Sequence, residues 1–157
     1  VTPQWYDTPD GGIDMSKLLL EFQQFFRENI ESWREHFEYK EAGFQLLLQA
    51  FLQRVVNGGG FIHREYALGS RRVDLLVRRP INDDLRREQK ILLELKTVRA
   101  KRSLDRVLRE GLEQTAAYAA TAGADEAHLV ICDERPGISW DEKIYDRVEH
   151  GIHVWGM

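Results

Sequence analysis

Cysteine and proline are scarce in this sequence, and long hydrophobic runs are missing. The 157 residues include one cysteine and four prolines. A single cysteine excludes an intrachain disulfide and a zinc site built from several cysteines, which fits a reducing compartment. The longest uncharged apolar runs, such as residues 18–20 and 46–48, fall far short of the roughly 20 residues of a membrane-spanning helix. We therefore expect a cytoplasmic protein without membrane contact.

The residues that are present are typical of one globular domain. Hydrophobic residues make up 43% of the chain and charged residues 31%, and the mean hydropathy is −0.47. Residues 1–13 hold two prolines and two glycines among polar residues, which predicts a linker or tail before a single domain at 14–157. Because the first residue is Val rather than Met, we expect the chain to be part of a longer protein.

Charge is unevenly distributed along the chain. The net charge of −4 argues against a nucleic-acid binder when it is averaged over the whole sequence. Residues 71–109, however, carry thirteen Lys or Arg against six Asp or Glu, a net +7, which leaves −11 for all other residues. This pattern predicts that any contact with a negatively charged partner lies in the middle of the chain.

Hydrophobic periodicity predicts an α/β protein. Apolar residues at three- and four-residue spacing indicate helices, and short apolar or alternating runs indicate strands. In chain order the sequence predicts two helices, three strands, a helix and a strand, followed by one or two short edge strands: 14–33, 39–56, 61–68, 72–77, 90–98, 103–121, 127–132, 144–148 and 152–155. We expect a small mixed sheet of four to five strands flanked by helices.

Three charged residues lie inside strands that are otherwise apolar. Asp74 interrupts the run 72–77, and Glu94 and Lys96 share one face of the strand 90–98 because alternate side chains of a strand point the same way. Burying such charges is costly unless they are paired or hold a metal. Two adjacent carboxylates suit Mg²⁺ or Mn²⁺, and a lysine beside them can stabilise charge on a phosphate. The alternative is a surface ion pair between Glu94 and Lys96, with Asp74 as a neighbour.

The sequence around these residues resembles the PD-(D/E)XK nuclease superfamily. Asp74 matches its first acidic position, Glu94-Leu95-Lys96 its Glu-x-Lys triplet, and Gln114-Thr-Ala-Ala-Tyr118 the Gln-x-x-x-Tyr signature of several branches. Val73 stands where the family has proline. The resemblance covers about residues 39–132 and implies a restriction-endonuclease-like core, with the order helix, three strands, helix, strand.

The resemblance also implies roles for individual residues. Asp74 and Glu94 would hold Mg²⁺ or Mn²⁺, together with Glu41 in the second helix, and Lys96 would position or activate a water. Gln114 and Tyr118 would orient the substrate. Glu41 has an alternative role as an acidic first-turn residue that stabilises its helix.

Further phrases are similar to the nuclease-like domain at the C-terminus of large bacterial P-loop ATPases. They are Ala50-Phe-Leu-Gln-Arg-Val-Val-Asn-Gly-Gly-Gly60, Arg64-Glu-Tyr-Ala-Leu-Gly69 and Glu110-Gly-Leu-Glu-Gln114. This likeness implies an N-terminal P-loop ATPase domain in a longer chain. The sequence itself contains no Gly-x-x-x-x-Gly-Lys-Ser/Thr motif, so ATP binding would belong to that other part.

Basic residues next to the triplet are candidates for nucleic-acid contacts. The residues expected to lie along a phosphate backbone are Arg71, Arg72, Arg99, Lys101, Arg102 and Arg106. Runs of charge are also commonly solvated faces, and that alternative stays open here. We expect Cys132 to be a small core residue and His63, His128, His150 and His153 to lie incidentally on the surface.

These features together predict a nuclease that hydrolyses nucleic acid, DNA in the first place, with Mg²⁺ or Mn²⁺. The alternative is a nuclease-like module that binds nucleic acid or docks to a protein without cutting, because a fold alone does not establish activity. A third possibility is a homo-oligomer formed through the aromatic first helix, which contains Phe22, Phe25, Phe26 and Trp33 and is followed by Phe37.

Overall fold

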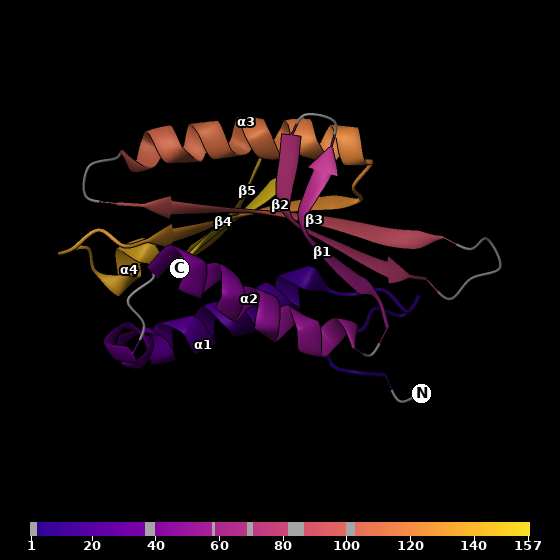
Figure 1. Ribbon diagram of the computed structural model, residues 1–157, viewed down its shortest axis with the longest axis horizontal. Coiled ribbons are helices and arrows are strands. Elements are labelled where there is room, and N and C mark those ends of the chain that lie inside the picture. Colours follow the sequence, from indigo (N-terminus) through magenta and orange to yellow (C-terminus); the bar gives the residue numbers. More distant parts are fainter. Residues whose placement is uncertain (1–2, 37–39, 58, 69–70, 82–86, 100–102) are drawn as a thin grey trace.

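One six-stranded sheet with helices on both faces forms the computed structural model of the chain (Figure 1). The structure describes residues 3–36, 40–57, 59–68, 71–81, 87–99 and 103–157, without the side chains of 31–36, 40–43, 65–68 and 71–73. The elements in chain order are α1 (Met15–His36), α2 (Lys40–Val56), β1 (Phe61–Leu68), β2 (Arg71–Pro80), β3 (Glu88–Val98), α3 (Leu104–Ala122), β4 (Glu126–Asp133), α4 (Trp140–Lys143), β5 (Tyr145–Glu149) and β6 (Ile152–Gly156). The α/β class expected from the sequence is confirmed.

The expected number of four to five strands is wrong, because the described residues form six strands that join one sheet in the order β1-β2-β3-β4-β6-β5. Strands β3, β4 and β6 run parallel, and the other pairs are antiparallel. The last strand, β6, lies inside the sheet rather than at its edge, since it pairs with β4 on one side and β5 on the other. Its burial on both faces, at Val154 and Trp155, suits an interior position.

Helices α1 and α2 cover one face of the sheet. Their apolar stripes bury Leu19, Phe22 and Phe26 of α1 against Phe44 and Leu48 of α2. The ring centroids of Phe26 and Phe44 are 5.1 Å apart, in an edge-to-face arrangement that aromatic pairs favour. Phe22 and Phe26 therefore pack inside the molecule, whereas Phe25 keeps 39% of its surface exposed. The side chain of Trp33 and residue Phe37 lie outside the described part of the structure.

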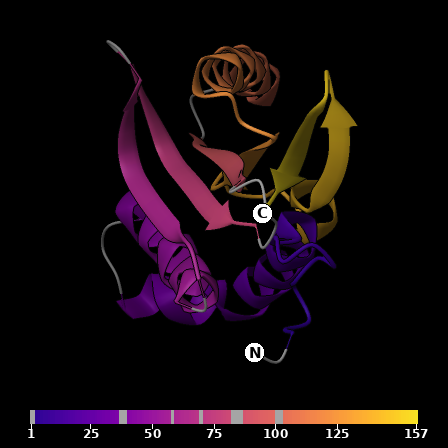
Figure 2. The ribbon, with the colours of Figure 1, turned by 90° about the vertical axis from the view of Figure 1, so that its right-hand side faces the viewer.

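Helix α3 covers the opposite face. Ser103 caps its start by accepting a hydrogen bond from the Arg106 N–H, and Gly123 ends it in the left-handed conformation at φ 65°. Val107, Leu108 and the small Gly111 and Thr115 face the sheet. Figure 2 shows the sheet curving around α3, with β1 and β2 on one side of the helix and the β5–β6 hairpin on the other.

Alternation along β3 assigns the charged residues to a face. Ile91 and Leu93 belong to the cluster under α1 and α2, whereas Leu92 and Val98 belong to the cluster under α3. Because Glu94 and Lys96 are spaced evenly between Leu92 and Val98, they lie on the α3 face. On β2, Asp74 shares this face with Leu76 by the same alternation.

The segment expected to be a linker or tail packs against the sheet along its described part. Ile13 is buried, and its N–H and C=O bond to the side-chain amide of Gln89 on β3. The Arg79 guanidinium lies 3.2 Å from the Asp7 carboxylate. Among the described residues, no helix combines the length and the apolar character needed to cross a membrane.

Candidate functional site

The predicted triplet lies where strands β2 and β3 part. In the described residues their ladder runs from the pair Pro80 and Glu88 to the pair Leu75 and Leu93. Beyond that pair, at Asp74 and Glu94, backbone N–H groups donate to carboxylate side chains instead of to backbone carbonyl groups. The Asp74 N–H donates to Oε1 of Glu94 at 3.1 Å, and the Leu95 N–H donates to Oδ2 of Asp74 at 2.8 Å. Two carboxylates are thereby fixed beside each other at the end of the ladder.

Burial makes this carboxylate pair electrostatically unfavourable. Glu94 is only 3% exposed. Burial in the first place, and the negative charge of Asp74 in the second, raise its pKa from the ordinary 4.5 to about 8, against the smaller opposing effects of the Asp74 N–H and the Lys96 ammonium. A hydrogen bond between the two carboxyl groups also favours the protonated form of Glu94. The raised pKa favours the protonated form of Glu94 at neutral pH, and a cation bound between the two carboxylates would replace that proton.

Lys96 lies beneath α3 on the same face of β3 as Glu94, and its positive charge lowers the pKa of Glu94. A Cβ atom added to Gly111 would lie 3.5 Å from the Lys96 Cγ and 3.0 Å from both methyl groups of Leu129. The lysine stem therefore runs directly under the helix, at a position where the helix carries no side chain. The absence of a side chain at Gly111 lets α3 approach β3 and β4 closely.

Gln114 and Tyr118 lie on the flank of α3 that faces β1 and β2. The opposite flank, which includes Leu112 and Ala116, lines a groove against the β5–β6 hairpin. Four-residue spacing places Gln114 and Tyr118 together, about half a turn away from that groove. Both are partly buried, and Tyr118 packs against the apolar cluster under α3. The structure thus brings this pair to the side of α3 where Asp74 lies.

Glu41, the third predicted ligand, lies in the first turn of α2, and its side chain is outside the described part of the structure. Helix α2 packs on the face of the sheet opposite to Glu94 and Lys96. Its role as a ligand stays a prediction. Among the described residues, no group of three or more His, Cys, Asp or Glu side chains is arranged to hold a metal ion.

The donor set of two carboxylates fits Mg²⁺ or Mn²⁺. These cations bind through one or two carboxylate oxygens and keep several waters as their other ligands. A divalent cation between Asp74 and Glu94 would also remove the like-charge repulsion that raises the pKa of Glu94. The chemistry of the residues therefore agrees with the cofactor that the sequence predicts.

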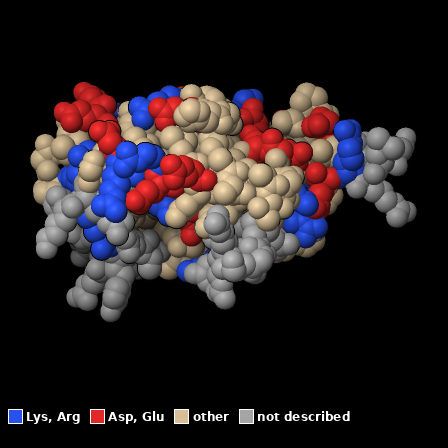
Figure 3. Space-filling view, turned by 90° about the horizontal axis from the view of Figure 1, so that it is seen from above, with Lys and Arg blue, Asp and Glu red and all other residues tan. Residues whose placement is uncertain are grey.

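The predicted nucleic-acid contacts are described only in part. Arg99 Nε lies 3.8 Å from Glu134 Oε2, and Arg106 Nε lies 3.0 Å from Glu110 Oε1. The side chains of Arg71 and Arg72, and residues Lys101 and Arg102, are outside the described part. Figure 3 views the face that α3 covers and shows basic and acidic side chains interspersed there. Phosphate contacts by the predicted residues stay predictions.

His128 differs from the sequence prediction, because it is fully buried rather than on the surface. Trp155 Nε1 donates to His128 Nδ1 at 3.0 Å, and His128 Nε2 lies 3.2 Å from Glu126 Oε2. Since Nδ1 accepts, the proton of a neutral ring is on Nε2 and can bond to Glu126. His128 is thus a core residue whose two ring nitrogens both have hydrogen-bond partners. Cys132 is buried, which confirms the prediction that it is a core residue.

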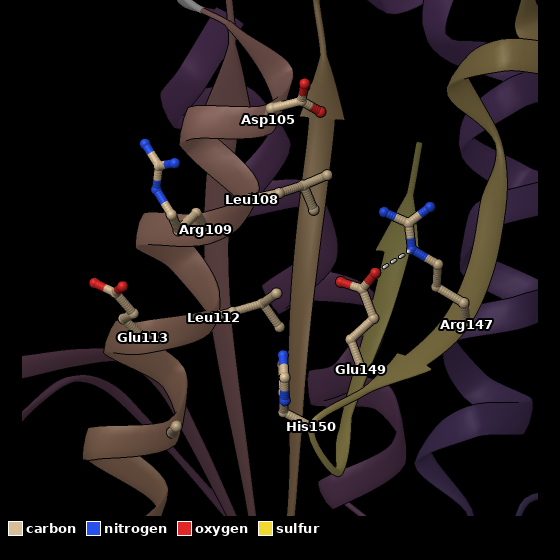
Figure 4. Close-up of a pocket in the computed structure, with 9 residues that line it drawn as sticks. Asp105, Leu108, Arg109, Leu112, Glu113, Arg147, Glu149 and His150 are labelled. Carbon is tan, nitrogen blue, oxygen red and sulfur yellow. Dashed lines mark ion pairs between the residues drawn. The ribbon is translucent and has the colours of Figure 1, made fainter.

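The sequence did not predict the groove of about 460 Å³ between α3 and the β5–β6 hairpin. Figure 4 shows Leu108 and Leu112 pointing from α3 towards the hairpin, where Arg147 and Glu149 form an ion pair of 3.2 Å. The apolar stripe of α3 had indicated only core packing. The stripe includes Leu112, which is not among the residues of α3 that are buried against the sheet. An apolar stripe wider than the buried face is the signal in the sequence that could have indicated the groove.

No family model, curated protein or solved structure matches this chain. A functional conclusion therefore depends on the geometry and chemistry of the site itself.

Proposed function

We propose that the chain is a metal-dependent nuclease that hydrolyses phosphodiester bonds at Asp74, Glu94 and Lys96. The observation that carries this proposal is the reciprocal hydrogen bonding of Asp74 and Glu94 at the point where β2 leaves β3. It supports a site with two fixed carboxylates, because burial and the neighbouring negative charge raise the pKa of Glu94, and a bound proton or cation relieves both effects. DNA is the substrate we expect first.

The residues have distinct roles in this proposal. Asp74 and Glu94 bind Mg²⁺ or Mn²⁺, which when bound lowers the pKa of a water and neutralises charge on the phosphate. Lys96 lies on the same face as Glu94 and stabilises the negative charge that develops on the phosphate oxygens. Gln114 and Tyr118 orient the substrate from the flank of α3. These two contacts depend on the resemblance to the nuclease superfamily as well as on their position.

The reaction is a simple hydrolysis. A water oxygen forms a new bond to phosphorus, and the bond between phosphorus and the departing sugar oxygen breaks. The attacking water releases its proton to solvent, and the departing oxygen takes a proton from solvent. Lys96 keeps its own proton throughout and acts through its charge.

A second candidate is a nuclease-like module that binds nucleic acid or a protein partner without cutting. The same hydrogen bonds favour it, because Asp74 and Glu94 can close the end of the β2–β3 ladder as a purely structural lock. On this reading an N-terminal ATPase domain in a longer chain would supply the activity. The two candidates differ in one measurable property, because only the nuclease cleaves nucleic acid.

The deciding experiment is a cleavage assay on labelled single- and double-stranded DNA and RNA, with Mg²⁺, Mn²⁺ or EDTA. The variants are Lys96→Met and, as a matched control on the same strand, Lys90→Met. We expect Mn²⁺- or Mg²⁺-dependent cleavage by the parent and by Lys90→Met, with loss of roughly a hundredfold or more in Lys96→Met. Equal cleavage by Lys96→Met and the parent, or none by the parent on every substrate, would favour the module.

A further inference from the structure

Strand β1 begins with a large aromatic side chain left in solvent. Phe61 is 58% exposed although it lies in a regular strand. Its neighbour Ile62 packs towards the cluster under α1 and α2. Because side chains alternate along a strand, Phe61 and His63 both lie on the other face, which is the face of Asp74 and Glu94. An exposed aromatic residue is thus carried by the same surface as the carboxylate pair.

The ring next to Phe61 is held in place by a chain of polar contacts. The ring centroids of Phe61 and His63 are 6.5 Å apart, with the ring planes inclined by 28°. Arg78 Nη1 lies 3.4 Å from His63 Nε2, and because a guanidinium only donates, this ring nitrogen accepts. Arg78 is itself held by Glu88, whose oxygens lie 2.8 to 3.1 Å from Nε and Nη2. The ring of His63 is therefore oriented in advance of any binding.

Strand register gives the distance from these rings to the proposed site. Phe61 lies directly opposite Arg78 on β2, and His63 lies opposite Leu76. Asp74 is four residues from Arg78 along the same strand and on the same face, a separation of about 13 Å. A few nucleotides of an extended strand can span this distance.

We propose that Phe61 and His63 form a stacking platform for an unpaired base, so that the substrate of this site is single-stranded nucleic acid. The inference depends on the proposed nuclease function for its choice of ligand. Aromatic side chains stack on unpaired bases in a way that tolerates any sequence, because every base has a flat aromatic face. In an intact duplex the inner bases cover one another, and their faces are closed to a side chain.

The charge of the protein also favours this substrate over a duplex. Duplex binding relies on many phosphate contacts, which suit a strongly basic surface. The chain has a net charge of −4, and Arg78, Arg79 and Arg106 each lie within 3.2 Å of a carboxylate. Stacking supplies affinity that does not depend on excess positive charge. We therefore expect binding to weaken only gradually with added salt.

The test measures binding in EDTA, where metal-dependent cleavage cannot occur. The probes are a short fluorescein-labelled oligothymidine strand and a labelled hairpin duplex, followed by fluorescence anisotropy. We expect Phe61→Ala to weaken binding of the single strand about tenfold and Phe61→Trp to retain it. Leu20→Ala is the matched control, because Leu20 is 52% exposed on α1, on the other side of the sheet. It should bind like the parent, and thermal unfolding of each variant verifies its fold.

Three outcomes would overturn the platform. The first is parent-like binding of the single strand by a folded Phe61→Ala, and the second is a loss of duplex binding in Phe61→Ala as large as its loss of single-strand binding. The third is that the parent binds no single strand. A change in oligomeric state on Phe61→Ala with unaltered binding would also overturn it, in favour of a contact between copies. Failure of the nuclease proposal is distinguishable, because it appears as cleavage that does not respond to Lys96→Met while the anisotropy result holds.

Discussion

The two flanks of α3 handle charge in opposite ways. On the side of β1 and β2, two carboxylates are held together where Glu94 is almost fully buried, and the pKa of Glu94 is raised to about 8. On the side of the β5–β6 hairpin, Arg147 and Glu149 pair over the groove with side-chain exposures of 45% and 36%. The second arrangement is the ordinary way to place charge near a surface. The first costs stability, and a cost of that kind is typical of functional sites.

The largest difference between the flanks should be seen in Asp74→Asn. This substitution keeps an oxygen that can accept from the Leu95 N–H, but it removes one of the two negative charges. We expect cleavage to fall by roughly a hundredfold or more. Because Glu94 loses its repelling neighbour, we also expect the free energy of unfolding at pH 8 in EDTA to rise by about 1–2 kcal/mol. Loss of both activity and stability would contradict this view of the site.

The pH dependence of stability isolates the contribution of Glu94. Its pKa is about 8 in the folded protein against the ordinary 4.5, so the folded state binds more protons than the unfolded state between these values. This stabilisation is complete below about pH 4.5 and is lost as the pH rises through 8, by up to about 1.4 kcal/mol per pH unit. Urea unfolding in EDTA from pH 5 to 9 measures it.

Glu94→Gln serves as the control for this titration, because glutamine stays neutral throughout. We expect its free energy of unfolding to vary much less than that of the parent over the same pH range. A parent curve that runs parallel to that of Glu94→Gln would show that Glu94 does not titrate in this window.

A smaller effect is expected from Gly111→Ala, at the closest approach of α3 to the sheet. The new methyl group would lie 3.0 Å from two carbon atoms of Leu129 and 3.5 Å from the Lys96 Cγ. We expect the free energy of unfolding to fall by about 1 kcal/mol, since Leu129 must shift to make room. Cleavage should fall as well, because the Lys96 stem lies in the same contact. Parent-like thermal unfolding and cleavage would argue against this contact.

The smallest effect is expected in the groove between α3 and the β5–β6 hairpin. Arg147→Ala removes one partner of an exposed ion pair, which is worth less than about 1 kcal/mol. We expect the thermal midpoint and the cleavage rate to change little. A large loss of cleavage in this variant would place the reaction at the groove beside the β5–β6 hairpin rather than at Asp74 and Glu94.

The sequence was sufficient to place the charged triplet but not its surroundings. Alternation along β3 assigned Glu94 and Lys96 to one face, and the four-residue spacing of Gln114 and Tyr118 put both on one side of their helix. Burial of Glu94 follows from how the strands pair and part, which periodicity does not contain. The order of residues along one strand predicts which face a side chain lies on, whereas the residues that surround it depend on how the whole chain folds.

The misplaced features show the same limit. His128 was expected on the surface, but its partner Trp155 is 27 residues away in sequence and adjacent only through the pairing of β4 with β6. The interior position of β6 has the same origin, because a short alternating segment does not reveal which strands flank it. The net positive charge of segment 71–109 likewise did not reveal the carboxylate partners of its arginines: Arg78 pairs with Glu88 inside the segment, and Arg99 pairs with Glu134 outside it.

Calorimetric titration with Mn²⁺ measures whether Asp74 and Glu94 bind a divalent cation, on which the proposed reaction depends. The parent, Asp74→Asn and Lys90→Met should be compared at pH 8. We expect one Mn²⁺ site in the parent and in Lys90→Met, with proton release as Glu94 ionises, and an affinity at least about tenfold lower in Asp74→Asn. Equal Mn²⁺ binding by the parent and Asp74→Asn, or none by the parent, would contradict this expectation.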